Sequence, residues 1–165
     1  MLLLRTDDEY YTPKHAWEDI RHVIPTDKVL WEAFKGDGTS GEYLKELGYD
    51  VVMTDEDFFT CEPKGDIVVS NPPFSKCKEV LERLVSLDMP FILILPAFKL
   101  HTRYVKQLFG STLKDLKLFV PPRRINFIKP GLAKSKCSFD CFYWSWKNPC
   151  VASLPSLNFV PPVTP

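Results

Sequence analysis

The chain alternates between short apolar runs and stretches in which apolar residues recur every three or four positions. The runs have the length and composition typical of strands, and they cover residues 28–34, 49–53, 67–69, 91–95, 116–120, 125–128 and 139–146. The helical spacing predicts amphipathic helices between them, at residues 13–24, 43–47, 80–87 and 104–109. Strands that alternate with helices favour an α/β fold built on a mostly parallel sheet.

The end of the chain departs from this alternation. The last two apolar runs flank the turn dipeptide Pro130-Gly131, which predicts a terminal antiparallel hairpin. From Asn148 onwards five prolines fall within eighteen residues, and this density predicts an extended tail, because proline donates no backbone hydrogen bond. We therefore expect a single domain at residues 1–147, which is an ordinary domain size, and a proline-rich C-terminal tail at residues 148–165.

The composition is that of an ordinary globular protein. The 21 basic residues balance the 21 acidic ones and 45% of the chain is hydrophobic, which argues against a disordered or a membrane-embedded protein. The start of the chain is too short for the apolar part of a signal peptide, and no apolar run approaches membrane-spanning length. The five cysteines complete no zinc site and form no paired framework, so we expect reduced thiols in an intracellular protein, cytoplasmic or nuclear.

Basic residues concentrate in one segment although the net charge is zero. Between Val120 and Cys137 the chain carries five cations and no acid, namely Arg123, Arg124, Lys129, Lys134 and Lys136. A local strip of positive charge can contact phosphates, and nearby aromatic residues can stack on bases, so we expect this strip to bind nucleic acid. The alternative is a solvated hairpin whose aromatic residues pack on the sheet.

The most distinctive segment follows the apolar run at residues 67–69 and reads Asn71-Pro72-Pro73-Phe74. Two successive prolines end the strand and hold the next residues extended. The Asn71 amide and the adjacent carbonyls are therefore expected at the carboxyl edge of the sheet, where open α/β folds bind ligands. Two oxygen acceptors beside an aromatic ring fit a planar amino group, so the segment predicts a site that alkylates an NH2. The alternative is an ordinary Pro-Pro turn.

A glycine-rich loop follows the apolar run at residues 28–34. Gly36 and Gly38 come before an amphipathic stretch, and a strand, glycine loop and helix in this order let a ligand approach the backbone closely. The glycine spacing matches neither a phosphate-binding loop nor the dinucleotide fingerprint. Because Glu32 and Phe34 precede the glycines, the loop predicts a ligand with a cationic amino-acid end.

An acidic turn follows the second strand. Asp55 is placed where such folds commonly bind ribose hydroxyls, and Asp57 beside Phe58 could hold an adenine. The alternative is a solvated acidic turn with Phe58 or Phe59 in the core.

The segment before the first helix is rich in aromatic and polar groups. It reads Tyr10-Tyr11-Thr12-Pro13-Lys14, with Thr12 expected as the N-cap and Pro13 at the first helical position. Taken alone, a hydrophobic staple for the helix is the favoured interpretation.

The order of these motifs resembles that of S-adenosylmethionine-dependent amino methyltransferases. It is most similar to the DNA adenine-N6 branch, whose hallmark is an Asn/Asp-Pro-Pro-aromatic tetrapeptide after the fourth strand, and the resemblance covers roughly residues 10–147. It implies a Rossmann-like class I methyltransferase fold and S-adenosyl-L-methionine as cofactor. Such sheets usually have a further helix and strand after the second strand. This chain has no room for them between Asp55 and Ile67, so we expect a shortened sheet.

The resemblance also implies roles for individual residues. It assigns cofactor binding to Tyr11, Thr12, Pro13, Lys14, Glu32, Phe34, Gly36, Gly38, Asp55, Asp57 and Phe58. The glycines and the acid before them would surround the methionine part, the later acids would reach the ribose and adenine, and the N-terminal segment would close over the cofactor. In the tetrapeptide, Asn71 and the Pro72 carbonyl would accept the protons of the substrate amine, while Phe74 would stack on its ring.

The function implied by the resemblance is methylation of the exocyclic N6 amine of adenine in nucleic acid, with DNA favoured over RNA. A base within a duplex would first have to flip out. The chain lacks a separate target-recognition domain, so its loops, a recognition subunit or a second copy in a homodimer would supply specificity. Two alternatives stay open: methylation of a glutamine amide in a protein, and a non-catalytic methyltransferase-like subunit that binds a partner. No metal is implied.

Overall fold

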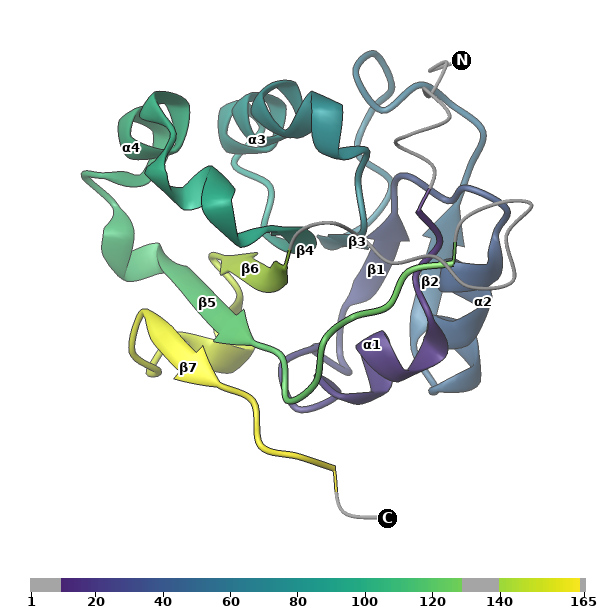
Figure 1. Ribbon diagram of the computed structural model, residues 1–165. Coiled ribbons are helices and arrows are strands. Elements are labelled where there is room, and N and C mark those ends of the chain that lie inside the picture. The colour runs from purple at the N-terminus through teal and green to yellow at the C-terminus, as the bar shows by residue number, and fades with distance from the viewer. Residues whose placement is uncertain (1–9, 129–139, 164–165) are drawn as a thin grey trace.

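In the computed structural model, which describes residues 10–128 and 140–163, the chain folds around a seven-stranded sheet (Figure 1). The strands are β1 (Val29–Glu32), β2 (Asp50–Met53), β3 (Ile67–Ser70), β4 (Phe91–Pro96), β5 (Leu116–Val120), β6 (Cys141–Trp146) and β7 (Leu157–Phe159). They lie in the order β2-β1-β3-β4-β6-β5-β7. Only the pairs that β6 forms with β4 and β5 are antiparallel. The alternation of strands and helices therefore predicted the mostly parallel sheet.

Helices cover both faces of the sheet. The helices α1 (Lys14–Glu18) and α2 (Thr39–Glu46) lie on one face, and α3 (Cys77–Ser86) and α4 (Arg103–Phe109) lie on the other (Figure 1). Short 3-10 turns complete the connections, at η2 (Phe74–Lys76), η3 (Ala97–His101), η4 (Leu113–Asp115) and η5 (Pro149–Val151). Within the described residues no helix is both long and apolar enough to span a bilayer.

Alternate residues of the central strands enter two separate cores. Leu30 packs into the core beneath α1 and α2, whereas its neighbour Trp31 packs into the core beneath α3 and α4. Every residue of β3 and β4 is buried, because central parallel strands are covered on both faces. This burial explains why these two strands appear in the sequence as continuous apolar runs.

The first helix is shorter than its apolar spacing predicts. α1 ends at Glu18 rather than near Ile24, and single turns follow, with the backbone N–H of Ile20 bonded to Trp17 and that of Val23 bonded to Ile20. Ile20, Val23 and Ile24 are nevertheless buried. The spacing therefore identified the buried face correctly, while the backbone satisfies its hydrogen bonds through successive turns.

The antiparallel partner of β6 differs from the prediction. Residues 125–128 form no strand with β6. The β6 strand lies between β4 and β5 instead, and Ile128 bridges Tyr11. Ile125 and Phe127 are buried in the core, so their alternation comes from a loop that packs its apolar side chains inwards. The dipeptide Pro130-Gly131 lies outside the described residues.

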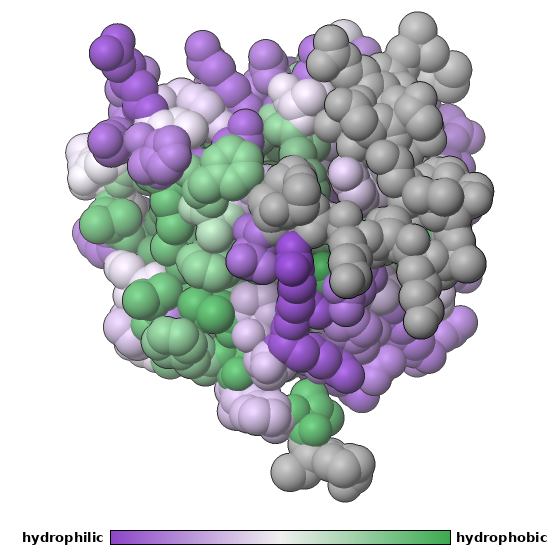
Figure 2. All heavy atoms as spheres, viewed as in Figure 1, coloured by the Kyte–Doolittle hydropathy of each residue, from purple (hydrophilic) through white to green (hydrophobic). Residues whose placement is uncertain are grey.

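The expected C-terminal tail takes part in the sheet. β7 pairs in parallel with β5 at the edge, and the Asn158 amide donates to the Leu118 and Pro155 carbonyls. Leu157 and Phe159 stay exposed, and Figure 2 shows apolar side chains gathered on the left of the view, where β5 and β7 lie in Figure 1. A three-residue strand between prolines carries too little periodicity to be recognised in a sequence.

The sheet is shortened where the sequence predicted. β2 is one of the two edge strands. Residues 54–66 lead from β2 to β3, on the other side of β1, and contain no helix or strand. Because β1, β2 and β3 are parallel, their carboxyl ends lie at the same end of the sheet.

Candidate active site

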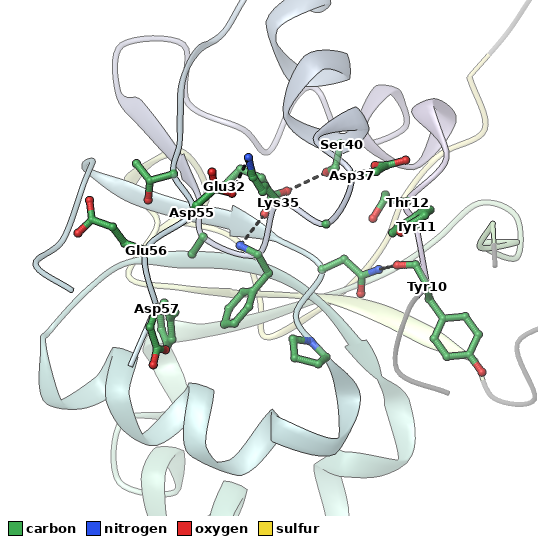
Figure 3. Close-up of a pocket in the computed structure, with 17 residues that line it drawn as sticks. Tyr10, Tyr11, Thr12, Glu32, Lys35, Asp37, Ser40, Asp55, Glu56 and Asp57 are labelled. Carbon is green, nitrogen blue, oxygen red and sulfur yellow. Dashed lines mark hydrogen bonds and ion pairs between the residues drawn. The ribbon is translucent and has the colours of Figure 1, made fainter. Parts of the chain in front are cut away.

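A cavity of about 240 Å³ lies at the carboxyl ends of β1, β2 and β3. Its walls contain ten of the residues predicted from the sequence, which are Tyr11, Thr12, Glu32, Phe34, Gly36, Asp55, Asp57, Phe58, Asn71 and Pro73. Figure 3 shows Glu56 and Asp57 on one side of the cavity and the Tyr10 to Thr12 segment on the other, with Glu32 between them. The fold thus brings together residues from four separate segments, because parallel strands end at the same edge.

Glu32 is the most deeply buried charge-bearing group of the cavity. It is 0% exposed at the end of β1. Ser40 donates to Oε2 at 2.8 Å, and Oε1 accepts from the Ser70 hydroxyl and from the Phe34 backbone N–H. Burial raises the pKa of the Glu32 carboxyl to about 7, and these three hydrogen bonds oppose the rise. A carboxylate has about four acceptor positions, so one stays available for a ligand.

The raised pKa of Glu32 predicts a pH-dependent stability. Its ordinary value is 4.5. A carboxyl group whose pKa is raised by folding favours the fold when protonated, so this contribution is lost as the pH rises from about 4.5 to 7. The loss amounts to about 3 kcal/mol at neutral pH. As the pH is raised from 5 to 7.5, we expect the melting temperature of the ligand-free protein to fall relative to that of the Glu32→Gln variant. Calorimetry measures both temperatures. Parallel curves for the two proteins would contradict the assignment.

The glycine loop adopts a conformation that other residues rarely tolerate. Gly36 has φ +57° and Gly38, which precedes α2, has φ +89°. The Asp37 carboxylate accepts from the Thr39 backbone N–H at 3.0 Å and so stabilises the start of the helix. A Cβ atom on Gly36 would lie 3.2 Å from the Tyr11 ring. The glycine therefore permits the close approach of the loop to the N-terminal segment.

Gly36→Ala is expected to weaken cofactor binding about tenfold, because left-handed strain of about 1–2 kcal/mol and contact with Tyr11 displace the cavity wall. Gly48→Ala is the matched control, since Gly48 has φ +101° but no neighbour within 4 Å and lies outside the cavity. Calorimetric titration with S-adenosylmethionine should separate the two variants, which share the backbone strain. Equal losses of affinity would contradict a local role of Gly36.

Asn71 carries an unsatisfied acceptor. Its Nδ2 donates to the Tyr10 carbonyl at 3.0 Å, which fixes the orientation of the amide, because a carbonyl can only accept. The other amide atom, Oδ1, is buried and has no hydrogen-bond partner among the described residues. A buried acceptor without a partner lowers the stability of the fold. This oxygen is therefore available to accept a hydrogen bond from a ligand.

Two members of the tetrapeptide do not line the cavity. Pro72 and Phe74 are absent from its walls, and Phe74 is only 6% exposed. The Tyr10 ring lies nearly parallel to that of Phe74, with centroids 5.9 Å apart and planes inclined by 21°, while Phe127 meets Phe74 edge-on. Tyr10 therefore covers the ring that was predicted to stack on the substrate, and it presents its own atoms to the cavity.

The opposite side of the cavity is acidic and aromatic. Five carboxylates line the cavity, those of Glu32, Asp37, Asp55, Glu56 and Asp57. Lys35 is the one basic residue among the described lining residues, and it pairs with Asp55 at 2.7 Å. Phe34 packs on Phe58 with centroids 4.8 Å apart, so both rings form an apolar wall. An excess of negative charge beside aromatic rings fits a cationic ligand that has an aromatic end.

Three residues assigned to the cofactor lie outside the cavity wall, namely Pro13, Lys14 and Gly38. Lys14 pairs with Glu46 of α2 at 2.7 Å on the surface, and Pro13 is the residue before α1. The lining part of the N-terminal segment is therefore Tyr10 to Thr12.

The two arginines of the predicted nucleic-acid-binding strip form ion pairs with carboxylates. Arg123 donates two hydrogen bonds, each 3.0 Å long, to the buried carboxylate of Asp19, and Arg124 lies 3.3 Å from Asp140. The Arg123–Asp19 pair thus links the loop after β5 to the segment after α1. Lys129, Lys134 and Lys136 lie outside the described residues.

Sequence reasoning missed four residues of the site. Ser40 and Ser70 hold Glu32, Lys35 pairs across the rim, and the Tyr10 carbonyl orients Asn71. Ser70 could have been noticed, because it precedes Asn71 at the end of a buried strand. The other three depend on contacts between distant segments and leave no local pattern.

No family model matches the chain, and no curated protein matches it. The solved structures that resemble its fold include the following three. The 23S rRNA methyltransferase ErmE has a TM-score of 0.52 and 13% identity over 82% of this chain and 69% of its own. A dimethyladenosine transferase from Plasmodium falciparum has a TM-score of 0.52 and 13% identity over 88% and 65%. A type I restriction enzyme modification subunit from Vibrio vulnificus has a TM-score of 0.53 and 9% identity over 86% and 45%.

The chain spans less than two thirds of the second and third of these proteins, and less than half of the third. At such low identity the likeness concerns the fold. The chain has the Rossmann-like methyltransferase fold, with a shortened sheet and one antiparallel strand among the parallel ones.

Proposed function

We propose that this protein is an S-adenosylmethionine-dependent methyltransferase that acts on the exocyclic N6 amine of adenine in nucleic acid, DNA in preference to RNA. The observation that carries the proposal is the buried Oδ1 of Asn71, which has no hydrogen-bond partner within the described part of the chain and shares a cavity with the buried carboxylate of Glu32. One end of the cavity can thus bind a cation while the other accepts a hydrogen bond from an amine.

The residues of the cavity fit the cofactor. S-adenosylmethionine carries an ammonium and a sulfonium, and the lining has five carboxylates against one lysine. Glu32 has a spare acceptor position for the ammonium, and the loop at Gly36 leaves no side chain in the way. The Phe34–Phe58 wall can cover an adenine face beside Asp57. The cofactor would supply a methyl group bound to a sulfonium sulfur. In the transfer a bond forms between the amine nitrogen and the methyl carbon as the carbon–sulfur bond breaks, the neutral thioether leaves, and the methylated nitrogen releases one proton to the solvent.

Asn71 would prepare the amine for this attack. An amino group on an aromatic ring is a poor nucleophile, because its lone pair is delocalised into the ring. An N–H that donates to Asn71 Oδ1 opposes this delocalisation and fixes the direction of the lone pair. The Tyr10 carbonyl holds the amide in the accepting orientation, so no reorganisation is needed when the substrate arrives. Positioning of the two reactants then accounts for much of the remaining rate.

Adenine is favoured as the substrate by the tetrapeptide and its resemblance to the DNA adenine-N6 branch. Two proteins of similar fold carry an rRNA methyltransferase or dimethyladenosine transferase name, and a third is named as a restriction modification subunit. The first name specifies rRNA and the second specifies an adenosine product, and both are compatible with adenine in nucleic acid as the substrate. The preference for DNA rests on the order of the sequence motifs.

The first test is calorimetric titration of the purified chain with S-adenosylmethionine, followed by methyl transfer to single-stranded DNA, duplex DNA and RNA of the same sequence. We expect micromolar binding and formation of N6-methyladenine. The rate should be faster on single strands, because flipping a paired base costs a few kcal/mol. Matched oligonucleotides with purine in place of adenine lack the amine and should stay unmodified. Methylation of glutamine peptides alone, or the absence of cofactor binding, would overturn the proposal.

A further inference from the structure

A second cavity, of about 150 Å³, lies at the opposite edge of the sheet. Its walls include Lys114, Lys117 and Lys147 together with Asp115 and Asn148. β5 begins here and the antiparallel β6 ends here, since Leu116 pairs with Trp146. The candidate active site lies at the carboxyl ends of β1 and β3, and β5 runs in the same direction as those strands. The two cavities therefore open at opposite edges of the sheet.

Lys117 is the unusual residue of this second cavity. It is only 7% exposed, and no carboxylate of the described residues lies within 4.0 Å of its ammonium. Its neighbour across the ladder is Ser145, whose buried hydroxyl has no hydrogen-bond partner among the described residues. The Lys117 ammonium is not among the buried unpartnered atoms of the described residues, so the stem of the side chain is buried while its charged end stays accessible. Lys117 therefore presents its ammonium with no carboxylate of the described residues in ion-pair range.

The other charges of the cavity leave Lys117 uncompensated. Lys147 pairs with Asp88 at 2.6 Å, and its ammonium lies 4.8 Å from the centre of the Trp146 ring. Asp115 is the one carboxylate among the described lining residues, and it interacts electrostatically with Lys147. The three lysines are thus balanced by only two carboxylates, Asp88 and Asp115, and the cavity keeps an excess of positive charge.

We propose that this cavity binds a phosphate group, with Lys117 as its central ligand. Lysine is a common phosphate ligand because its compact ammonium attracts the anion as a point charge. A phosphate offers several acceptor oxygens, so one group could contact all three lysines around the cavity. Its binding would also supply the missing partner of Lys117. The phosphate could belong to a free ion or to the backbone of a nucleic acid, and both sources share this chemistry.

The site is independent of methyl transfer, because it lies at the other edge of the sheet and uses none of the residues assigned to the cofactor or the amine. It can therefore be tested without cofactor. Lys117→Met keeps the apolar stem of the side chain and removes the charge. Lys106→Met is the matched control, since Lys106 is an exposed lysine of α4 outside both cavities.

Binding of inorganic phosphate and of a short single-stranded oligonucleotide should be measured for the full chain at constant ionic strength, by calorimetry and by fluorescence anisotropy. We expect Lys117→Met to weaken at least one of the two ligands tenfold or more, while Lys106→Met binds as the unaltered protein does. A loss confined to the oligonucleotide identifies a backbone phosphate, and a loss that includes the free ion identifies a site for phosphate itself. Equal binding of both ligands by all three proteins overturns the proposal.

The melting temperature provides a second and independent readout. Lys117→Met keeps the buried apolar stem and removes an ammonium that reaches the solvent, so the ligand-free variant should melt close to the unaltered protein. The ligand found in the binding experiment should raise the melting temperature of the unaltered protein and leave that of Lys117→Met unchanged. A lower melting temperature for ligand-free Lys117→Met would show that the ammonium already has a partner, and this result would also overturn the proposal.

Discussion

Asn71→Ala is expected to reduce methyl transfer by about 10²–10³-fold while leaving the affinity for S-adenosylmethionine unchanged. This is the size of effect seen when one preorganised hydrogen-bonding group is removed from a reacting centre. The substitution removes the acceptor that would hold the substrate amine, but it leaves Glu32 and the glycine loop intact. Single-turnover rates with an adenine-containing oligonucleotide, measured beside cofactor titrations, separate these two effects.

The stability of Asn71→Ala should change little, which makes the loss of rate interpretable. The substitution removes the hydrogen bond from Nδ2 to the Tyr10 carbonyl, but it also removes the buried, unpartnered Oδ1. These contributions have opposite signs and similar size. Asn71→Asp is the informative companion, because it keeps an oxygen acceptor while losing the donor to Tyr10. We expect its rate to lie between those of the other two proteins. A native rate for Asn71→Ala would exclude a catalytic role for this residue.

The strand ends of the site could be predicted because they depend on local patterns. Glu32 and Asn71 each follow an apolar run that forms a parallel strand, and parallel strands place their carboxyl ends at one edge. The juxtaposition of the two residues in one cavity follows from that rule alone. The glycine loop was recognisable for a similar reason, since Gly36 and Gly38 both need positive φ.

Contacts between distant segments could not be predicted. Tyr10 covers Phe74 although 64 positions separate them in the sequence, and nothing near either residue indicates the contact. Arg123 appeared in the sequence as part of a basic strip without acids, yet the fold brings Asp19 to it from 104 positions away. A run of like charges in a sequence therefore does not show that those charges are free to bind a ligand.

Glu32→Gln is expected to move cofactor affinity and stability in opposite directions. Gln has nearly the same shape and its amide can hydrogen-bond to the Ser40 and Ser70 hydroxyls, so the cavity should keep its form. The lost charge should weaken S-adenosylmethionine about 100-fold, because a hydrogen bond to a charged group contributes about 1.5–3 kcal/mol. At pH 7.5 the ligand-free variant should nevertheless be more stable by up to about 3 kcal/mol, since no carboxylate is ionised in the interior.

This opposition distinguishes a functional carboxylate from a structural one. If a buried acid served only the fold, its replacement would lower the stability of the protein. Cofactor affinity would then fall only to the extent that the variant is unfolded. Replacing a ligand-binding carboxylate that is ionised in the interior should instead raise the stability of the protein and lower its cofactor affinity. The reason is that the cationic ligand, and not the fold, balances the negative charge. Glu62→Gln, at an exposed acid outside the cavity, should change neither quantity. Calorimetric titration and thermal unfolding of the three proteins at pH 7.5 would decide the matter, and reduced stability with native affinity for Glu32→Gln would assign this carboxylate to the fold alone.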